Sequence, residues 1–147
     1  MARFSVAGNK GTASVRSIIL ARADVTVPQR GRVLDYMVGA ITTPADAAFD
    51  HELFRVSTAG TGAANTPKPH DPADAAAVFT GLDTVTVDPT IGNVLVRIPL
   101  NQRASFRWVA APGDELVWPA TASNGIGGGL ATAAVTDFSA TMMVDGN

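Results

Sequence analysis

Residues 94–100, with the sequence VLVRIPL, place an apolar side chain at every second position. Successive side chains of a β-strand point to opposite faces, whereas a helix needs apolar residues three or four positions apart. The stretch therefore predicts a strand that is buried on one face. The side chains expected to share that face are Val94, Val96, Ile98 and Leu100.

Similar alternations recur along the whole chain, and Gly, Pro, Asn and Asp separate them as turn-forming residues. Short strands at a spacing of roughly 8–12 residues are typical of sandwiches and jelly rolls. The sequence thus predicts one mainly β domain over residues 1–147, an antiparallel β-sandwich or jelly-roll-like fold. The alternating positions outside 94–100 include Phe4, Val6, Val25, Val27, Leu34, Tyr36, Val38, Ala40, Val85, Val87, Phe138, Ala140, Met142 and Val144.

Two short segments carry helix-start signals. Thr43 precedes Pro44 in TPADAA, and Asp71 precedes Pro72 in DPADAAA. A capping residue followed by Pro at the first helical position favours a helix start. Each segment predicts only one or two helical turns, because Gly, Pro or strand patterns follow soon after.

The alternation also predicts which large side chains form the core. Phe106 and Trp108 are two residues apart, so packing in the core is favoured over stacking on a sugar or base. Trp118 lies beside Pro119 at the end of a strand pattern and is expected at the rim instead. The predicted core residues are Tyr36, Val38, Val94, Val96, Ile98, Phe106, Trp108, Phe138 and Met142.

The composition excludes several kinds of chemistry. The 147 residues include no Cys, so disulfides, thiolate metal sites and cysteine nucleophiles are excluded. Hydrophobic residues make up 46% of the chain and charged residues 16%, with a formal charge of −2, so a basic nucleic-acid-binding face is not expected. The longest weakly polar stretch, residues 125–135, is too short to span a bilayer, so no membrane contact is expected.

Two glycine-containing segments resemble nucleotide-binding motifs only superficially. In residues 8–12, GNKGT, the lysine precedes the glycine, and a phosphate loop needs Gly-Lys followed by Ser or Thr. In residues 125–129, GIGGG, no strand–helix unit surrounds the glycines. Both segments are predicted to be turns, and the second is predicted to be mobile.

No group of polar residues forms a recognisable catalytic or metal-binding pattern. Asp50, His51 and Glu52 alternate between the two faces of a strand, so a surface position is favoured for His51 over a general base or metal ligand. The carboxylates Asp71, Asp74 and Asp83 lack the spacing of a calcium loop. The serines Ser57, Ser105 and Ser139 lie outside a nucleophile elbow. The sequence therefore predicts a protein that is not an enzyme and holds no metal or cofactor.

Residues 58–76, TAGTGAANTPKPHDPADAA, form a long polar segment between two strand patterns. Loops of this length are usually functional or disordered, and the prolines would keep this one extended and lower the entropy lost on docking. We therefore expect it to contact a partner. The residues predicted to make those contacts are Thr58, Gly60, Pro67, Lys68, Pro69, His70 and Pro72.

Several of these segments resemble small virion proteins of tailed bacteriophages. The resemblance is carried by LFRV at 53–56, TAGTG at 58–62, TPKPHDPADAA at 66–76, FRW at 106–108 and APGDEL at 111–116. It covers about the last hundred residues and is weaker before Arg32. His70 stands where the resemblance would place a more apolar residue. The resemblance implies a β-sandwich or jelly-roll-like protein that decorates or cements heads, or occurs elsewhere on the particle.

Low charge, a long extended segment and that resemblance favour a capsid decoration or cement protein over other classes. The expected partners are the major capsid protein and further copies of this chain, with a homotrimer favoured by the local threefold axes of capsid lattices. Such a protein would be made in the bacterial cytoplasm and carried on the virion surface. The alternative is a tail, fibre or host-glycan-binding module that uses Trp118.

Overall fold

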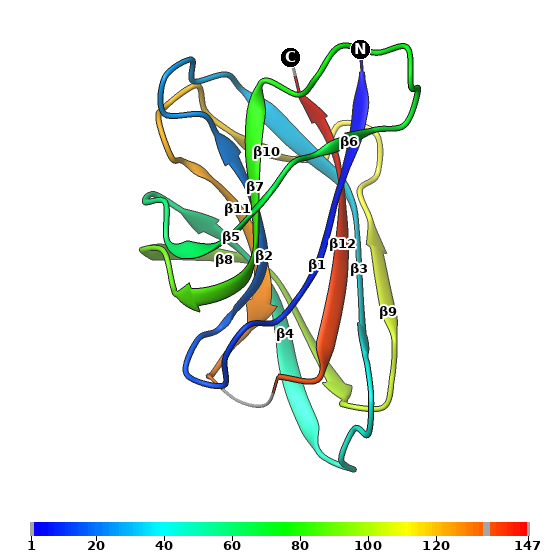
Figure 1. The fold of residues 1–147 in the computed structure, drawn as a ribbon. Helices are drawn as coiled ribbons and strands as arrows, with labels where there is room; N and C mark the ends of the chain where they lie inside the picture. Colours follow the sequence, from blue (N-terminus) through cyan, green and yellow to red (C-terminus); the bar gives the residue numbers. More distant parts are fainter. Residues whose placement is uncertain (1, 134–135, 147) are drawn as a thin grey trace.

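The computed structural model describes residues 2–133 and 136–146, and it confirms the predicted mainly β fold (Figure 1). Within these described residues, twelve strands form two antiparallel sheets that pack face to face as a β-sandwich. The strands are β1 (Arg3–Asn9), β2 (Ser17–Ala23), β3 (Gly31–Ala40), β4 (Ala48–Val56), β5 (Thr61–Asn65), β6 (Lys68–Pro69), β7 (Phe79–Val87), β8 (Ile91–Asn101), β9 (Phe106–Val109), β10 (Leu116–Trp118), β11 (Gly125–Leu130) and β12 (Phe138–Gly146).

The strand order brings distant parts of the chain together. In the first sheet the order is β6-β1-β12-β3-β10, and β9 also pairs with β3. In the second sheet the order is β5-β7-β2-β11-β4-β8. One side of the sandwich is therefore bordered by β5 and β6, and the opposite side by β8 and β9.

A single large hydrophobic cluster fills the space between the sheets. Within it, the ring centroid of Phe79 lies 5.4 Å from that of Phe4 and 5.6 Å from that of Trp118. Four of the nine predicted core residues are confirmed as buried, namely Tyr36, Val38, Phe138 and Met142. Four others are only half-buried and pack at the sheet edges, namely Val96, Ile98, Phe106 and Trp108.

The ninth predicted core residue, Val94, was assigned to the wrong face. Its side chain is 38% exposed, because a bulge interrupts β8 between Val94 and Val96. Val96 lies opposite Leu53, which belongs to the central cluster, whereas Val94 lies opposite Phe54, which points to the other side of the sheet. An extra residue at a bulge reverses the alternation beyond it.

Residues 125–129 are not a mobile turn as predicted. They belong to β11, a fully buried strand in the middle of the second sheet. A Cβ placed on Gly128 would lie 2.3 Å from the ring of Tyr36, and one on Gly127 would lie 2.5 Å from the ring of Phe54. The absence of side chains lets large residues pack directly against both faces of this strand.

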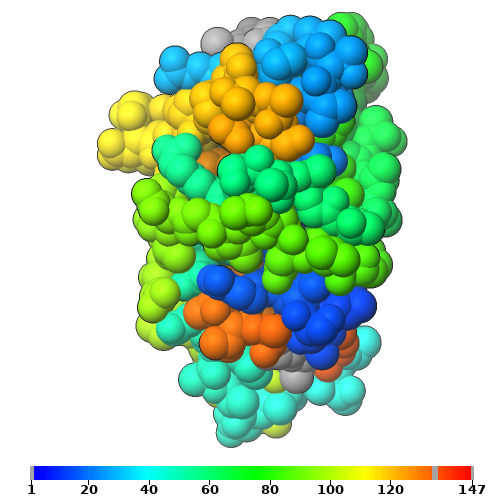
Figure 2. Space-filling view, turned by 90° about the vertical axis from the view of Figure 1, so that its left-hand side faces the viewer, coloured from blue at the N-terminus to red at the C-terminus, as the bar shows by residue number. Residues whose placement is uncertain are grey.

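The outer face of the second sheet holds a smaller hydrophobic cluster. Leu20, Phe54 and Leu82 lie side by side across β2, β4 and β7, and Val15, Val56 and Val85 complete the cluster. Beyond the last pair of β4 and β8, Ser57 N donates to Thr90 O (3.2 Å), which continues their ladder beside this cluster. Figure 2 shows this side of the molecule, where β5 lies beside the connection from β7 to β8.

The two predicted helical turns are absent from the described residues. In the segment at 43–48, Ala45 N instead donates to Gln102 Oε1 (3.1 Å), and Ala47 O accepts a bond from Gln102 N (2.7 Å). In the segment at 71–77, Asp74 N donates to Asp71 O (3.0 Å) in a single turn. Contacts with the rest of the chain override weak local helix signals.

Candidate partner-binding surfaces

Residues 58–76 were predicted to be one long loop, but Thr61–Asn65 and Lys68–Pro69 within it are strands. β5 extends the second sheet by pairing with β7, and β6 extends the first sheet by pairing with β1. The segment therefore crosses from one sheet to the other along one side of the sandwich. Proline is tolerated at such edges because an edge strand leaves half of its N–H groups unpaired.

The first two predicted contact residues hold this segment to the rest of the chain. Thr58 Oγ1 accepts a hydrogen bond from Thr90 N (2.7 Å), although the side chain is exposed. Gly60 has a φ of 67°, and a Cβ there would lie 3.0 Å from Pro89 N. Both residues lie at the outer face of the second sheet, away from the other five.

The other five predicted contact residues lie at the first sheet and beyond it. Pro67 is buried and Pro69, opposite Phe4, is half-buried, so neither projects freely. Lys68, His70 and Pro72 are exposed. The main chain at His70 is anchored, since His70 N donates to Arg3 O (2.8 Å). The structure thus leaves these three side chains free to reach a partner, whereas the hydroxyl of Thr58, although exposed, is bonded to Thr90.

An exposed apolar tip lies near residues 70–78 and was missed in the sequence. Val25 and Val27, which alternate as in a strand, are 63% and 57% exposed in the β2–β3 loop. Asp24 Oδ1 accepts bonds from Thr26 N (2.7 Å) and Val27 N (3.2 Å), which turns the chain out of the sheet. The sequence feature that could have predicted this loop is Asp24 followed by Pro28, since Asp and Pro both favour turns.

The tip and residues 70–78 stand at the same end of the sandwich. Ala23 pairs with Phe79, so the residues after β2 lie beside those before β7. In Figure 1 the β2–β3 loop projects at the upper left, and residues 70–78 arch over the upper right near the N-terminus. Together they form one exposed, mainly apolar end of the molecule.

Trp118 was predicted at the rim, which is wrong. Its side chain is fully buried in the central cluster, and Nε1 donates to Gln29 O (3.1 Å). Gly31 provides the space, because a Cβ there would lie 2.2 Å from the Trp118 ring. β10 pairs with β3 at Gly31, and this pairing carries the indole inward. Trp118 is therefore not available to stack on a sugar.

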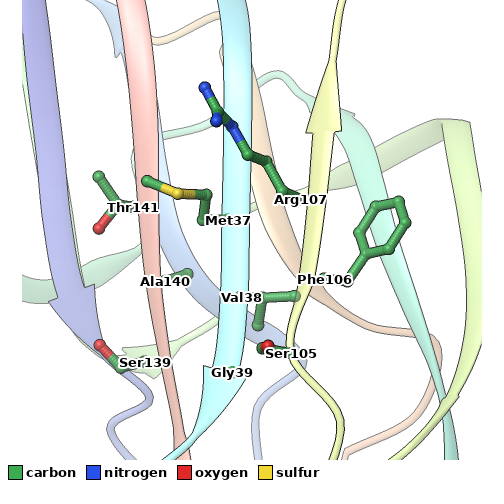
Figure 3. Close-up of a pocket in the computed structure, with 9 residues that line it drawn as sticks. All are labelled: Met37, Val38, Gly39, Ser105, Phe106, Arg107, Ser139, Ala140 and Thr141. Atoms are coloured by element: carbon green, nitrogen blue, oxygen red, sulfur yellow. The ribbon is translucent and has the colours of Figure 1, made fainter.

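A shallow hollow of about 500 Å³ lies on the outer face of the first sheet (Figure 3). It is lined by Met37 and Gly39 of β3, Thr141 and Ser139 of β12, and Arg107 of β9. Arg107 is already engaged, since its Nε donates to Asp35 Oδ2 (2.9 Å). The hollow is part of an open sheet face and encloses no group poised for reaction.

The Asp50–His51–Glu52 cluster is more buried than predicted. His51 was expected at the surface, but it is 1% exposed, with its ring 4.9 Å from that of Phe138. Glu52 is fully buried on the opposite face, where Arg16 and Arg97 each approach one of its carboxylate oxygens to 2.5 Å. His51 and Glu52 do point to opposite faces of the strand, as predicted, but other residues cover the side chain on each face.

Burial of His51 should make the protein less stable in mild acid. Burial lowers the pKa of His51 below its ordinary 6.5, against a smaller opposing effect of Asp50. The unfolded chain therefore takes up the proton first, so stability present above pH 6.5 is lost as the pH falls. We expect the free energy of unfolding to fall by up to about 1.4 kcal/mol per pH unit in that range.

Urea unfolding at about pH 7 and about pH 5.5 measures this effect. His51→Leu keeps an apolar side chain beside Phe138 and should reduce the loss of stability between the two pH values. Equal losses in the wild type and the variant would show that other groups cause the acid sensitivity.

The remaining motifs have structural roles. GNKGT was predicted to be a turn, but Gly8 and Asn9 end strand β1 and the turn follows at residues 13–14. Lys10 is buried, and its Nζ donates to Thr12 O (2.5 Å) and Val15 O (2.6 Å). Burial lowers the pKa of Lys10, and the nearby Asp88 opposes this effect. Within residues 2–133 and 136–146, no group of three or more His, Asp or Glu side chains could hold a metal ion. No helix of the described residues is long and apolar enough to cross a membrane.

Comparison with protein-family models, with curated proteins and with solved structures found no match.

Proposed function

We propose that this protein is a structural virion protein that decorates the head of a tailed bacteriophage, where it binds and stabilises the shell. The observation that supports this most is the exposed apolar tip formed by Val25 and Val27. Exposed valines at the end of a rigid sandwich are suited to docking, because burying each one removes apolar surface from water.

The sandwich supports the same proposal. β2 and β7, which hold the tip and residues 70–78, are paired in the second sheet, so the tip is presented on a rigid base. Rigid presentation limits the conformational entropy lost on binding. Many copies on a shell would add avidity, so each copy needs only a small contact surface. The major capsid protein is the partner that this function requires, and self-association as a homotrimer would present three tips together.

A tail, fibre or glycan-binding role was the alternative. Its proposed aromatic platform, Trp118, lies in the core with its ring covered. No other observation in the described structure favours that role over head decoration.

Binding to purified heads that lack the protein tests the proposal. The double variant Val25→Ser, Val27→Ser should bind at least about tenfold more weakly, because burial of each valine contributes about 1.5–3 kcal/mol. Val87→Ser is the matched control, since Val87 is 58% exposed but lies at the other end of β7. Co-sedimentation with the heads gives the affinities. Equal binding of the double variant and the control would overturn the role of the tip, and no binding of wild type would overturn the function.

A further inference from the structure

A second shallow hollow lies beside β10, between the ends of the two sheets. It has a volume of about 560 Å³ and is lined by Arg30, Arg55, Val117, Pro119 and Ala120. The two arginines come from different sheets, since Arg30 immediately precedes β3 and Arg55 belongs to β4. Among the described residues, no carboxylate lines this hollow. We call it the arginine hollow.

Both arginines of the hollow have unused hydrogen-bond donors. Arg55 Nη1 donates to Val117 O (2.7 Å), which fixes one end of the guanidinium beside β10. Its other nitrogens make no hydrogen bond within residues 2–133 and 136–146. Arg30 is exposed, and its side chain makes neither a hydrogen bond nor an ion pair in that part of the chain. The arginines that pair with carboxylates of this chain are instead Arg16, Arg32, Arg97 and Arg107.

The acidic residues of this region do not pair with the two arginines. Glu115 and Asp145 line an adjoining hollow, and Asp114 lines neither. Arg32 Nη2 lies 2.8 Å from Asp145 Oδ2, and its Nη1 lies 3.9 Å from Glu115 Oε1. In the β2–β3 loop, Asp24 Oδ1 accepts two main-chain N–H groups of its own loop. The guanidinium groups of the arginine hollow are therefore available to an anion from outside the chain.

The arginine hollow adjoins the loop that carries the apolar tip. That loop covers residues 24–30. Near its start, Ser123 N donates to Ala23 O (3.2 Å), and near its end Trp118 Nε1 donates to Gln29 O (3.1 Å). Both ends of the loop thus contact β10 and the segment that follows it. In Figure 2 this segment, in orange, lies beside the blue β2–β3 loop. A partner that docks on the tip would therefore lie next to the hollow.

The lining of the arginine hollow fits an acidic side chain. A guanidinium is planar and offers paired donors that match the two oxygens of a carboxylate. Val117, Pro119 and Ala120 supply an apolar wall for the methylene groups of a Glu or Asp side chain. A nucleic acid is a poorer fit, because it presents a run of phosphates and this chain has a formal charge of −2.

We propose that the arginine hollow binds a carboxylate side chain of the shell protein on which the tip docks. The inference rests on the proposed function and adds the chemistry of the partner, an acidic residue beside the apolar surface that receives the valines. Complementary charges fix the register of docking and speed association, whereas the valines bury apolar surface. The two contacts thus have different roles in one interface.

Binding to purified heads that lack the protein tests this contact, in a phosphate-free buffer of low ionic strength. Arg30→Gln with Arg55→Gln should bind at least about tenfold more weakly than wild type, because two charge-assisted contacts are lost. Each single substitution should weaken binding in the same direction. Added NaCl should reduce the difference between wild type and the double variant, since salt screens exposed charges. Co-sedimentation gives the affinities.

Arg103→Gln is the matched control for loss of one positive charge. Arg103 is exposed and lies in the turn between β8 and β9, at the other end of the sandwich from the tip (Figure 1). This variant should bind heads like wild type. Circular dichroism verifies that every variant keeps the β fold.

Heads whose carboxylates have been amidated with carbodiimide and ethanolamine test the chemistry of the partner. Amidation removes the negative charge, so wild type and the double variant should bind these heads equally. A double variant that binds unmodified heads like wild type, or a difference that persists on amidated heads, would overturn the inference and leave the proposed function standing. Failure of the wild type to bind any heads would instead overturn the proposed function, and with it the partner named here.

Discussion

Replacing Gly128 with alanine is expected to lower the free energy of unfolding by about 3 kcal/mol, at the upper end for an overpacked core. The new Cβ would lie 2.3 Å from Cε2 and 2.6 Å from Cζ of Tyr36. Tyr36 is fully buried, so its ring has no solvent-facing space to enter. Gly128 also lies between Ile19 and Leu53 on the paired strands, which limits movement of β11. Urea unfolding at fixed protein concentration measures the loss.

Gly39→Ala is the matched control, because Gly39 is also a strand glycine. A Cβ there would meet Ser105 Cβ at 3.4 Å, which is an ordinary contact, and the expected change is below about 0.5 kcal/mol. The clash itself is tested by repeating Gly128→Ala in a Tyr36→Leu background, where the penalty should shrink. A penalty unchanged in that background would show that Tyr36 is not the obstacle.

The fold class was predictable because a two-residue period reports directly on strands. β12 carries that period around Met142, and Met142 and Tyr36 are buried as predicted, although a bulge in β3 beside Tyr36 turns Val33 rather than Leu34 toward the core. β8 carries the same period, but its bulge moves Val94 to the other face. A bulge depends on how the partner strand pairs, and a single strand's pattern does not contain that information.

The buried glycine strand could not be predicted from local pattern. A run of glycines has no side-chain period, and glycine favours turns as readily as close packing. The glycines form a buried strand because the rings of Tyr36 and Phe54, from distant parts of the chain, pack against them. The same holds for residues 58–76, whose strands form only because β1 and β7 offer open edges.

The candidate surface was predictable only in part. Lys68, His70 and Pro72 are exposed, as a contact role requires, whereas Pro67 is buried. The sequence could not show that Val25 is exposed in a loop, because Val-Thr-Val is equally compatible with a strand.

Trp118→Ala is expected to cost about 4 kcal/mol of unfolding free energy, within the range for removing a buried large aromatic side chain. The substitution empties the space next to Phe79 and removes the hydrogen bond from Nε1 to Gln29 O. Because Gly31 offers no side chain to fill the gap, the cavity should collapse only partly. A rim tryptophan would instead be removed at little cost, so this variant distinguishes the two positions.

Trp108→Ala provides the comparison, since Trp108 is half-buried at the sandwich edge and its loss should cost about half as much. Both variants are measured by urea unfolding at one protein concentration, because association would add to the apparent stability. The free energy of unfolding should fall more for Trp118→Ala than for Trp108→Ala, and its dependence on urea concentration should stay unchanged. A loss for Trp118 below about 1 kcal/mol would mean that the indole is not packed between Phe79 and Gly31. The pairing of β10 with β3, which carries Trp118 into the core, would then need revision.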